Sequence, residues 1–268
     1  MIQKILMHTA ADLATHIGAK AIVSFVEPFP FESEIPVIWV QDLQIDVLKE
    51  LTMQDIFEVS ERHLLDAAVQ IYLSRRFEEG QMVGVLPYAI LIYDIKQARN
   101  FINIREYEDI VPRDIIFAAI SLATEIGVQG REGRPVGTAF IIGDSDEIFA
   151  HSHQAILNPF LGQKPEDCDI KNRDNWESIK EFSLLDGVFV VERDGIIRAA
   201  GRYLDMDGGC VRIPAGLGGR HRAAAAITKK LPVVGVTLSE SGGIVRVFRD
   251  GECKLSINSD LRIVRYDQ

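Results

Sequence analysis

The sequence predicts an α/β protein with two domains, a parallel-sheet α/β domain followed by a domain with a mixed central sheet flanked by helices. Segments with a helical period alternate with continuous apolar runs, which is the pattern of strands buried on both faces. The 268 residues, 47% of them hydrophobic, are enough for two cores. A polar stretch at 103–114 interrupts the alternation, so we expect domains of 1–112 and 113–268.

In the first domain, the spacing of apolar residues separates helices from strands. Apolar positions recur at helical spacing over 3–17, and Gly18 is a typical helix stop. A short run rich in β-branched residues follows and ends before Pro28. The expected elements are a helix over 3–17, strands over 21–26 and 37–40, a helix over 60–77, and one buried strand over 83–93.

In the second domain, glycine-containing turns separate the elements. Arg193-Asp194-Gly195 lies between two β-branched runs and predicts a hairpin. The expected elements are a helix over 113–126, strands over 137–143, 187–192 and 196–203, a helix over 223–230, and strands over 233–238 and 244–248. Hairpins combined with helical connections predict the mixed sheet.

Charge and cysteine content exclude several classes of protein. The net charge of −10 and pI near 5.1 disfavour general binding to nucleic acid. Cys168, Cys210 and Cys253 are far apart and odd in number, which predicts neither a disulfide framework nor a zinc site. The N-terminus lacks a signal-peptide pattern, and the longest apolar run, 82–93, is too short to span a bilayer. We therefore expect a cytoplasmic protein with no membrane partner.

The stretch from Gly216 to Arg222 is the most informative for chemistry. Its glycines allow backbone N–H groups to approach a ligand, and it lies directly before a predicted helix start, which favours anions. Arg220 and Arg222 carry guanidinium groups suited to phosphate oxygens, and His221 can donate a further hydrogen bond. Local chemistry leaves two readings open, a polyphosphate site or a glycine-rich helix entry with two solvated arginines.

Two further stretches carry carboxylates in polar turns. Asp186 stands at the start of a predicted strand, where it could ligate a divalent cation or orient a hydroxyl nucleophile. Ser239 and Glu240 join two predicted strands and could meet phosphate or metal. Taken alone, each is more often an ordinary turn.

Other polar and aromatic candidates are weaker. His151 and His153 point the same way on a strand, but no nearby cysteine completes a zinc set, so a surface loop is favoured. Trp39 and Trp176 are expected to pack rather than to stack on bases. The charged segment 166–177 is typical of a solvated loop.

Taken together, the stretches in the second domain resemble the diadenylate cyclase (DAC) domain. That family pairs an Asp-Gly-Ala motif with a downstream Gly-Thr-Arg-His-Arg motif. The counterparts here are Asp186-Gly187-Val188 and Gly218-Gly219-Arg220-His221-Arg222. The resemblance covers roughly 115–255 and includes the Asn-Pro-Phe at 158–160 and the Ser-Glu-Ser turn at 239–241.

Two departures from the family pattern stand at Val188 and Gly219. The first replaces the family's alanine and changes packing, and the second removes a threonine hydroxyl. Losing one neutral hydrogen bond costs about 0.5–1.5 kcal/mol, which is too little to abolish chemistry. Because the charged residues are all present, an active enzyme is favoured.

The resemblance implies a reaction in which two ATP molecules become cyclic di-AMP and two pyrophosphates. Asp186, Arg220, His221 and Arg222 would be catalytic, with Asp186 and Glu240 as ligands of Mn²⁺ or Mg²⁺. The implied nucleotide-binding set is Gly187, Val188, Gly218, Gly219, Arg220, His221, Arg222, Ser239 and Glu240. Since one domain binds one ATP, the active state would be a homo-oligomer with catalytic domains face to face.

The N-terminal stretch 8–27 is similar to the C-terminal α/β domain of pyruvate kinase. Such a domain, regulatory or oligomerising, ahead of a DAC domain resembles the archaeal version of the enzyme and implies an archaeal source. Two other readings stay open. One is a catalytically inactive nucleotide-binding regulator, supported by Val188 and Gly219. The other is a pyruvate-kinase-related allosteric module, although nothing in 1–112 supplies a phosphoryl-transfer site.

Overall fold

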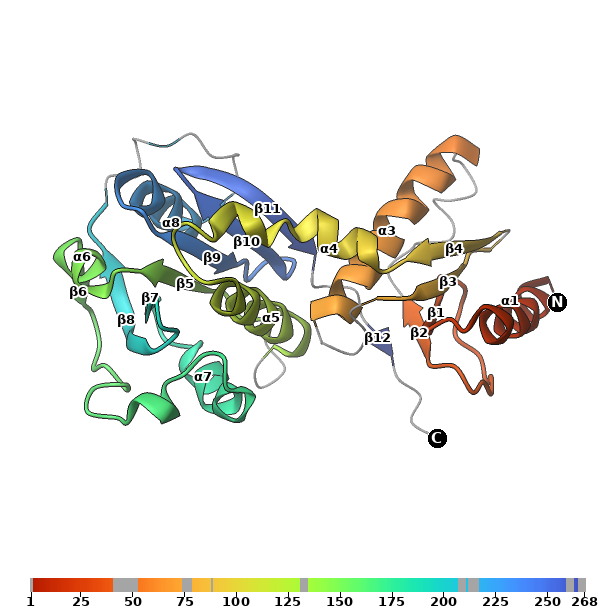
Figure 1. Cartoon of the computed structure of the whole chain (residues 1–268), viewed down its shortest axis with the longest axis horizontal. Coiled ribbons are helices and arrows are strands. Elements are labelled where there is room, and N and C mark those ends of the chain that lie inside the picture. Colours follow the sequence, from red (N-terminus) through yellow and green to blue (C-terminus); the bar gives the residue numbers. More distant parts are fainter. Residues whose placement is uncertain are drawn as a thin grey trace. The chain divides into compact units, whose positions relative to one another are not determined.

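The chain forms two compact units, one of Met1–Ile102 with Leu261–Gln268 and one of Asn103–Asp260. The computed structural model describes residues 2–40, 53–73, 79–87, 89–130, 135–206, 211, 217–258 and 263–264 (Figure 1). Both units combine a mixed sheet with helices, which confirms the predicted α/β class. Within these residues we find no helix with the length and apolar character needed to cross a bilayer.

The first unit has a five-stranded sheet in the order β12-β2-β1-β3-β4. Its elements are α1 (Ile2–Ile17), β1 (Ala21–Ser24), β2 (Val37–Val40), α3 (Met53–Leu73), β3 (Gln81–Val85), β4 (Ile90–Asp94), α4 (Lys96–Ile102) and β12 (Ile263–Val264). The central strand β1 is parallel to β2 and β3, as predicted. The edge strands β4 and β12 are antiparallel to their neighbours.

The prediction of one strand over 83–93 is wrong, because this segment folds back on itself. The amide of Leu86 donates to the carbonyl oxygen of Ala89 at 2.8 Å and closes a turn between β3 and β4. Pro87 lies in that turn, and proline cannot donate to a strand ladder. The helix α3 also begins earlier than predicted, and its predicted end at 77 lies outside the described residues.

The two units divide after Ile102, ten residues before the boundary that we expected. The segment that follows belongs to the second unit because its apolar side chains are buried there. A 3-10 helix, η1 (Ile104–Tyr107), buries both of its end residues. Asp109 accepts two hydrogen bonds from the guanidinium of Arg249, at 2.6 and 2.7 Å. Linker composition alone does not reveal such contacts.

The second unit has a seven-stranded mixed sheet in the order β11-β10-β9-β5-β7-β8-β6. Its elements are α5 (Arg113–Gln129), β5 (Thr138–Gly143), α6 (Ser145–Ala150), β6 (Ser152–Gln154), α7 (Trp176–Phe182), β7 (Val188–Glu192), β8 (Ile197–Leu204), α8 (Gly219–Lys230), β9 (Val234–Leu238), β10 (Ile244–Arg249) and β11 (Glu252–Asn258). Strands β5 and β7 are parallel, and every other pair is antiparallel.

Helices α5 and α8 lie on opposite faces of this sheet (Figure 1). The core under α8 combines strand residues such as Ile141 and Val190 with Ala224 and Ala225 of the helix. Strand alternation directs Phe140 to the other face, where it stacks on Phe189 with ring centroids 4.8 Å apart. Small residues on α8 let its backbone approach the sheet closely, which fixes where the helix begins.

A buried cation joins α5 to α7. The side chain of Lys180 is 2% exposed and pairs with Glu125 and, at 2.8 Å, with Glu177, while Gln129 accepts a third hydrogen bond at 3.1 Å. The carboxylates differ in exposure, at 30% for Glu125 and 72% for Glu177. The partly buried pair with Glu125 therefore carries most of the interaction.

We expect Lys180→Ala to lower the free energy of unfolding of the second unit by about 3 kcal/mol, because it leaves Glu125 half-buried without its cation. Glu177→Gln should cost less than about 1 kcal/mol, since exposed ion pairs contribute little. Urea unfolding followed by Trp176 fluorescence measures both. Equal losses in the two variants would contradict this division of the network.

Candidate functional site

Four segments meet at one end of the second sheet, namely those directly before β5 and β7, the turn after β9 and the N-terminus of α8. Because β5 and β7 are parallel neighbours, both begin at this end, and Asp186 lies just before β7. Strand β9 is antiparallel to β5, with Thr138 opposite Leu238, so the turn after β9 arrives at the same end. That turn carries Ser239 and Glu240. The fourth segment is the N-terminus of α8.

An ion pair joins the two predicted motifs. Arg220 donates from Nη2 to Oδ1 of Asp186 at 3.0 Å and from Nε to the carbonyl oxygen of Gly187 at 3.3 Å. The Arg220 side chain is 28% exposed and that of Asp186 is 75% exposed. Asp186 therefore presents its second carboxylate oxygen to solvent while a fixed cation stands beside it.

Glu240 belongs to the same cluster, and Gly137 makes room for it. A Cβ added to Gly137 would lie 3.0 Å from Cβ of Glu240, 3.1 Å from its amide nitrogen and 3.4 Å from Nη1 of Arg220. Gly137 is not among the site residues expected from the sequence. Its position directly before a buried strand was the available signal.

The arginine-histidine-arginine motif lies inside α8, which corrects our expectation that it precedes a helix starting at 223. The helix begins at Gly219, and Gly218 caps it without a side-chain hydrogen bond. Successive residues of a helix point about 100° apart. Arg220 accordingly contacts Asp186, His221 is buried, and Arg222 is exposed.

His221 lies between α8 and β10. It is 5% exposed, its Nε2 lies 3.5 Å from Nη1 of Arg246, and its ring meets that of Phe248 edge-on at 6.3 Å. Burial, followed by the positive charges of Arg246 and Arg220, lowers the pKa of His221 to about 4. The ring is neutral at physiological pH. Arg246 was missed by sequence analysis because a lone arginine in a strand carries no motif.

The remaining predicted nucleotide-binding residues differ in their surroundings. Val188 is 3% exposed in the core under α8, so its change from alanine is a matter of packing. Gly187 has φ +99°, and an added Cβ would lie 2.6 Å from the carbonyl oxygen of Arg202. At Gly218 and Gly219 an added Cβ would meet nothing within 4 Å. Ser239 donates from Oγ to the carbonyl oxygen of Ser241 at 3.0 Å, within its turn.

The carboxylates suit a divalent cation that is shared with a phosphate ligand. Asp186 and Glu240 are both exposed, Asp186 pairs with Arg220, and Glu240 and Arg220 both lie beside Gly137. Among the described residues, no group of three or more His, Cys, Asp or Glu side chains could enclose a metal ion. Mg²⁺ usually takes one or two carboxylates together with substrate phosphates rather than a cage made of protein alone.

The weaker histidine candidates do not form a metal site in the part of the chain that is described. Nδ1 of His153 lies 2.7 Å from Oδ1 of Asp205, whereas Nδ1 of His151 lies 3.4 Å from Nζ of Lys230. The two histidines thus have separate partners. Cys168 and Cys253 are free thiols, and Cys210 and Gly216 lie outside the described residues.

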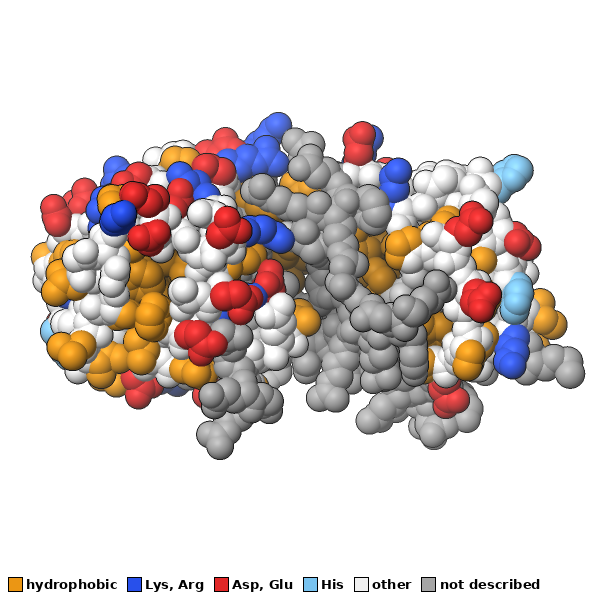
Figure 2. Space-filling view, turned by 90° about the horizontal axis from the view of Figure 1, so that it is seen from below, with side chains coloured by type: hydrophobic (Ala, Val, Ile, Leu, Met, Phe, Trp, Pro, Cys, Tyr) orange, Lys and Arg blue, Asp and Glu red, His pale blue; other side chains and the backbone are white. Residues whose placement is uncertain are grey.

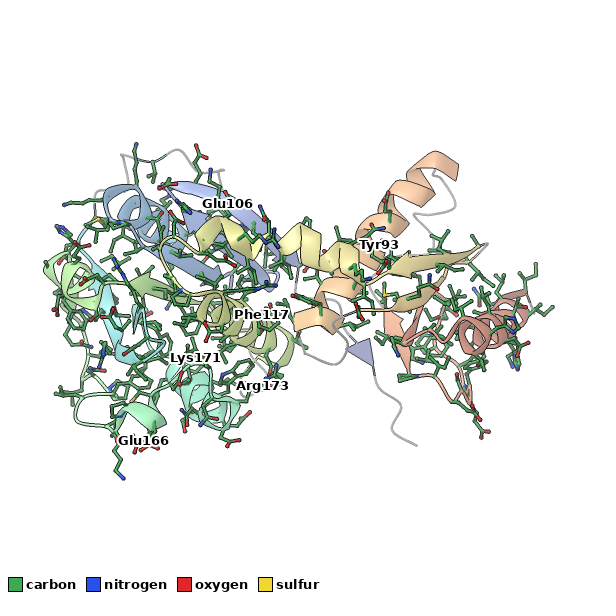
Figure 3. The ribbon with its side chains drawn as sticks, in the orientation of Figure 1. Tyr93, Glu106, Phe117, Glu166, Lys171 and Arg173 are labelled. Carbon is green, nitrogen blue, oxygen red and sulfur yellow. The ribbon has the colours of Figure 1, made fainter. Side chains whose placement is uncertain are left out.

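Both tryptophans are packing residues, as predicted. Trp39 is 3% exposed and Trp176 is 4% exposed. Trp176 donates from Nε1 to the carbonyl oxygen of Ile170 at 2.7 Å, and Arg173 covers its ring at 4.6 Å. Arg173 lies on the charged segment between β6 and α7, and Figure 3 shows it beside α7.

Substitution by alanine should affect the stability of the protein very differently at the glycines of the two motifs. We expect Gly187→Ala to lower stability by about 2 kcal/mol or more, because the position has positive φ and no room. Gly218→Ala should leave stability within about 0.5 kcal/mol, because it meets only open space. Thermal unfolding distinguishes them. A large loss in Gly218→Ala would show that this glycine serves the fold rather than a ligand.

The depressed pKa of His221 should make stability pH-dependent. Between pH 6.5 and about 4 the unfolded histidine takes up a proton that the folded one resists, so stability falls as pH drops through this window. The shift corresponds to about 3 kcal/mol at most. Urea unfolding at several pH values should give a flatter profile for His221→Gln. Identical profiles for both proteins would contradict the assignment.

Two bacterial proteins are among the solved structures that this chain is similar to. One is DacA from Staphylococcus aureus, in the form of a double cysteine mutant, with TM-score 0.36 and 18% identity, covering 55% of this chain and 88% of that one. The other is a hypothetical membrane spanning protein from Bacillus cereus, with TM-score 0.43 and 16% identity, covering 61% and 72%.

Two curated relatives are each named diadenylate cyclase. The protein from Methanocaldococcus jannaschii is 44% identical over 150 residues, which are 55% of this chain and 47% of the relative. The protein from Haloferax volcanii is 38% identical over 187 residues, which are 69% of this chain and 61% of the relative. The matches therefore span about half to three fifths of the relatives' length.

Two family models match separate parts of the chain. Residues 5–96 match a family described as "Probable sensor domain DacZ_A", while the likeness to pyruvate kinase stays a prediction. Residues 125–253 match the DAC family, described as "DisA bacterial checkpoint controller nucleotide-binding". The second match contains Asp186, Arg220 and Glu240, the residues that converge at the end of the sheet. Residues 125–253 belong to the diadenylate cyclase (DAC domain) family.

Proposed function

We propose that this protein condenses two ATP molecules into cyclic di-AMP and releases two pyrophosphates. The ion pair between Arg220 and Asp186 carries the proposal, because it unites the two family motifs in one exposed site. The relatives named diadenylate cyclase support it. The source that we expect is an archaeon, since both relatives come from archaea.

Each 3′-hydroxyl attacks the α-phosphate of the other ATP, and pyrophosphate leaves. Positioning and charge neutralisation dominate such a displacement. The first-turn amides of α8 have no helical acceptor, so with Arg220 and Arg222 they are suited to hold the phosphates. His221 is suited to donate a further hydrogen bond to them. Asp186 keeps one carboxylate oxygen exposed, which orients the attacking hydroxyl.

We propose that Mg²⁺ or Mn²⁺ binds with the nucleotide, held by Asp186 and Glu240. When bound, the cation would neutralise charge on the phosphates and on the leaving pyrophosphate. Arg220 already pairs with Asp186 and so offsets the charge of that carboxylate before the nucleotide arrives. The use of ATP and the free thiols support a cytoplasmic location for the reaction.

Two sites must face each other, so we propose a two-fold homodimer as the catalytic unit. An apolar surface beside Asp186 supports this. Hydrophobic side chains gather on one face of the second unit (Figure 2), and Leu157 and Leu161 are 95% and 80% exposed. A Cβ added to Gly201 would lie 2.3 Å from Cγ1 of Ile156 and 3.7 Å from the carbonyl oxygen of Asp186. The apolar segment therefore borders the site.

A nucleotide-binding regulator without turnover is the second candidate. It rests on the departures at Val188 and Gly219. Since Val188 lies in the core, only the missing hydroxyl at Gly219 bears on the ligand. Gly219→Thr restores that hydroxyl and is the variant to make if ATP binds but does not react.

The test is to incubate the full chain with ATP and Mn²⁺ or Mg²⁺ and to detect cyclic di-AMP by mass spectrometry. We expect product from ATP and none from GTP, with a loss of about 100-fold or more in Asp186→Asn. The matched control is Asp194→Asn. This carboxylate is exposed, lies in the turn at the other end of β7 and pairs with Arg198. ATP binding without product under either metal would favour the regulator.

A further inference from the structure

Arg246 is a half-buried cation in β10 without an acidic partner. Two other cations of the second unit with little exposure are paired, Arg249 with Asp109 and Lys180 with Glu125. Within the described residues, Arg246 makes no ion pair, and its one side-chain hydrogen bond goes to His221. A guanidinium placed there has a role other than neutralising a carboxylate.

The contact with Arg246 determines the protonation of His221. A guanidinium is always charged and only donates, so Nη1 is the donor across the 3.5 Å to Nε2. Nε2 must then carry a lone pair, and the neutral ring must hold its proton on Nδ1. Arg246 thus selects one of the two tautomers.

The other groups that face His221 favour the same neutral ring. Phe248 meets it edge-on from β10, and Arg220 adds a second positive charge from its own helix. The carboxylate of Asp186 is paired with Arg220. Cys253, on β11 near Arg246, has a thiol pKa raised by burial and carries no charge. No described carboxylate competes for the histidine.

We propose that Arg246 is a positioning residue that holds His221 as the Nδ1–H tautomer, so that Nδ1–H donates to the polyphosphate of the bound nucleotide. Nδ1 is bonded to Cγ and so lies closer than Nε2 to the helix backbone. The same backbone carries the first-turn amides of α8, whose helical hydrogen bonds begin with Arg222 N–H to the carbonyl oxygen of Gly218 at 3.3 Å. With the proton on Nε2 instead, Nδ1 would repel a phosphate oxygen.

This inference rests on the proposed function, because the nucleotide comes from there, but its first test needs no turnover. In the full chain labelled with ¹⁵N-histidine, ring nitrogen shifts report the tautomer of each of the six histidines. His221 is identified by the signal lost in His221→Gln. We expect a protonated Nδ1 and a bare Nε2 at pH 7 in the wild type. A proton on Nε2 would overturn the proposal, whatever the variants do.

Three substitutions distinguish loss of the contact between Arg246 and His221 from loss of a nearby positive charge. Arg246→Met should release the tautomer and raise the pH at which His221 titrates, whereas Arg246→Lys, which keeps a charged donor, should preserve Nδ1–H. Arg222→Met is the matched control, because this arginine is exposed on the same helix, next to His221 in sequence. An unchanged tautomer in Arg246→Met would contradict the proposal.

A double-mutant cycle with inorganic pyrophosphate tests the phosphate contact. We expect Arg246→Met and His221→Gln each to weaken pyrophosphate binding about tenfold, and the double variant to lose no more than either alone. Additive losses would mean that Arg246 binds phosphate itself and would overturn the positioning role. If these results hold while ATP gives no cyclic di-AMP, the proposed function fails and the role of Arg246 stands.

Discussion

The ion pair between Arg220 and Asp186 depends on one architectural constraint, the parallel pairing of β5 with β7 at the centre of the second sheet. That pairing starts both strands at one edge, and antiparallel β9 delivers its turn to the same edge. Ala224 and Gly235 then let α8 approach the sheet, since a Cβ added to Gly235 would lie only 3.2 Å from that of Ala224. The helix therefore begins directly over the site.

The site concentrates positive charge in a protein whose net charge is −10. Arg246 and Arg220 lie near a histidine that burial keeps neutral, and Arg222 is exposed on the same helix. A charged imidazole would add repulsion to this cluster, whereas the neutral ring accepts a hydrogen bond from one arginine. One carboxylate, Asp186, offsets part of the charge. The remaining field favours an anion without drawing one to the rest of the surface.

Polar residues near the site also serve the fold. Asn158 accepts from the amides of Phe160 and Ala200 through Oδ1 and donates to the carbonyl oxygen of Arg198 through Nδ2. Its place in the family pattern thus reflects the anchoring of a loop to β8. Arg202 similarly donates to Ser152 from Nε and stacks over Phe149. These residues hold the strand that borders Asp186, which explains why a motif residue need not touch a ligand.

The class, most elements of the second unit and the two motifs could be predicted from the sequence, because periodicity, turns and glycine-rich helix entries are local signals. The part that each motif residue plays depends on how the elements pack. Arg220, His221 and Arg222 are adjacent in sequence, but successive residues of α8 point in different directions. Arg220 therefore contacts a carboxylate, His221 is buried and Arg222 is exposed. Strand pairing brought Gly137 and Arg246 to the site, and Val188 went to the core. Contacts between distant segments arise from the packing of helix on sheet, which no local pattern encodes.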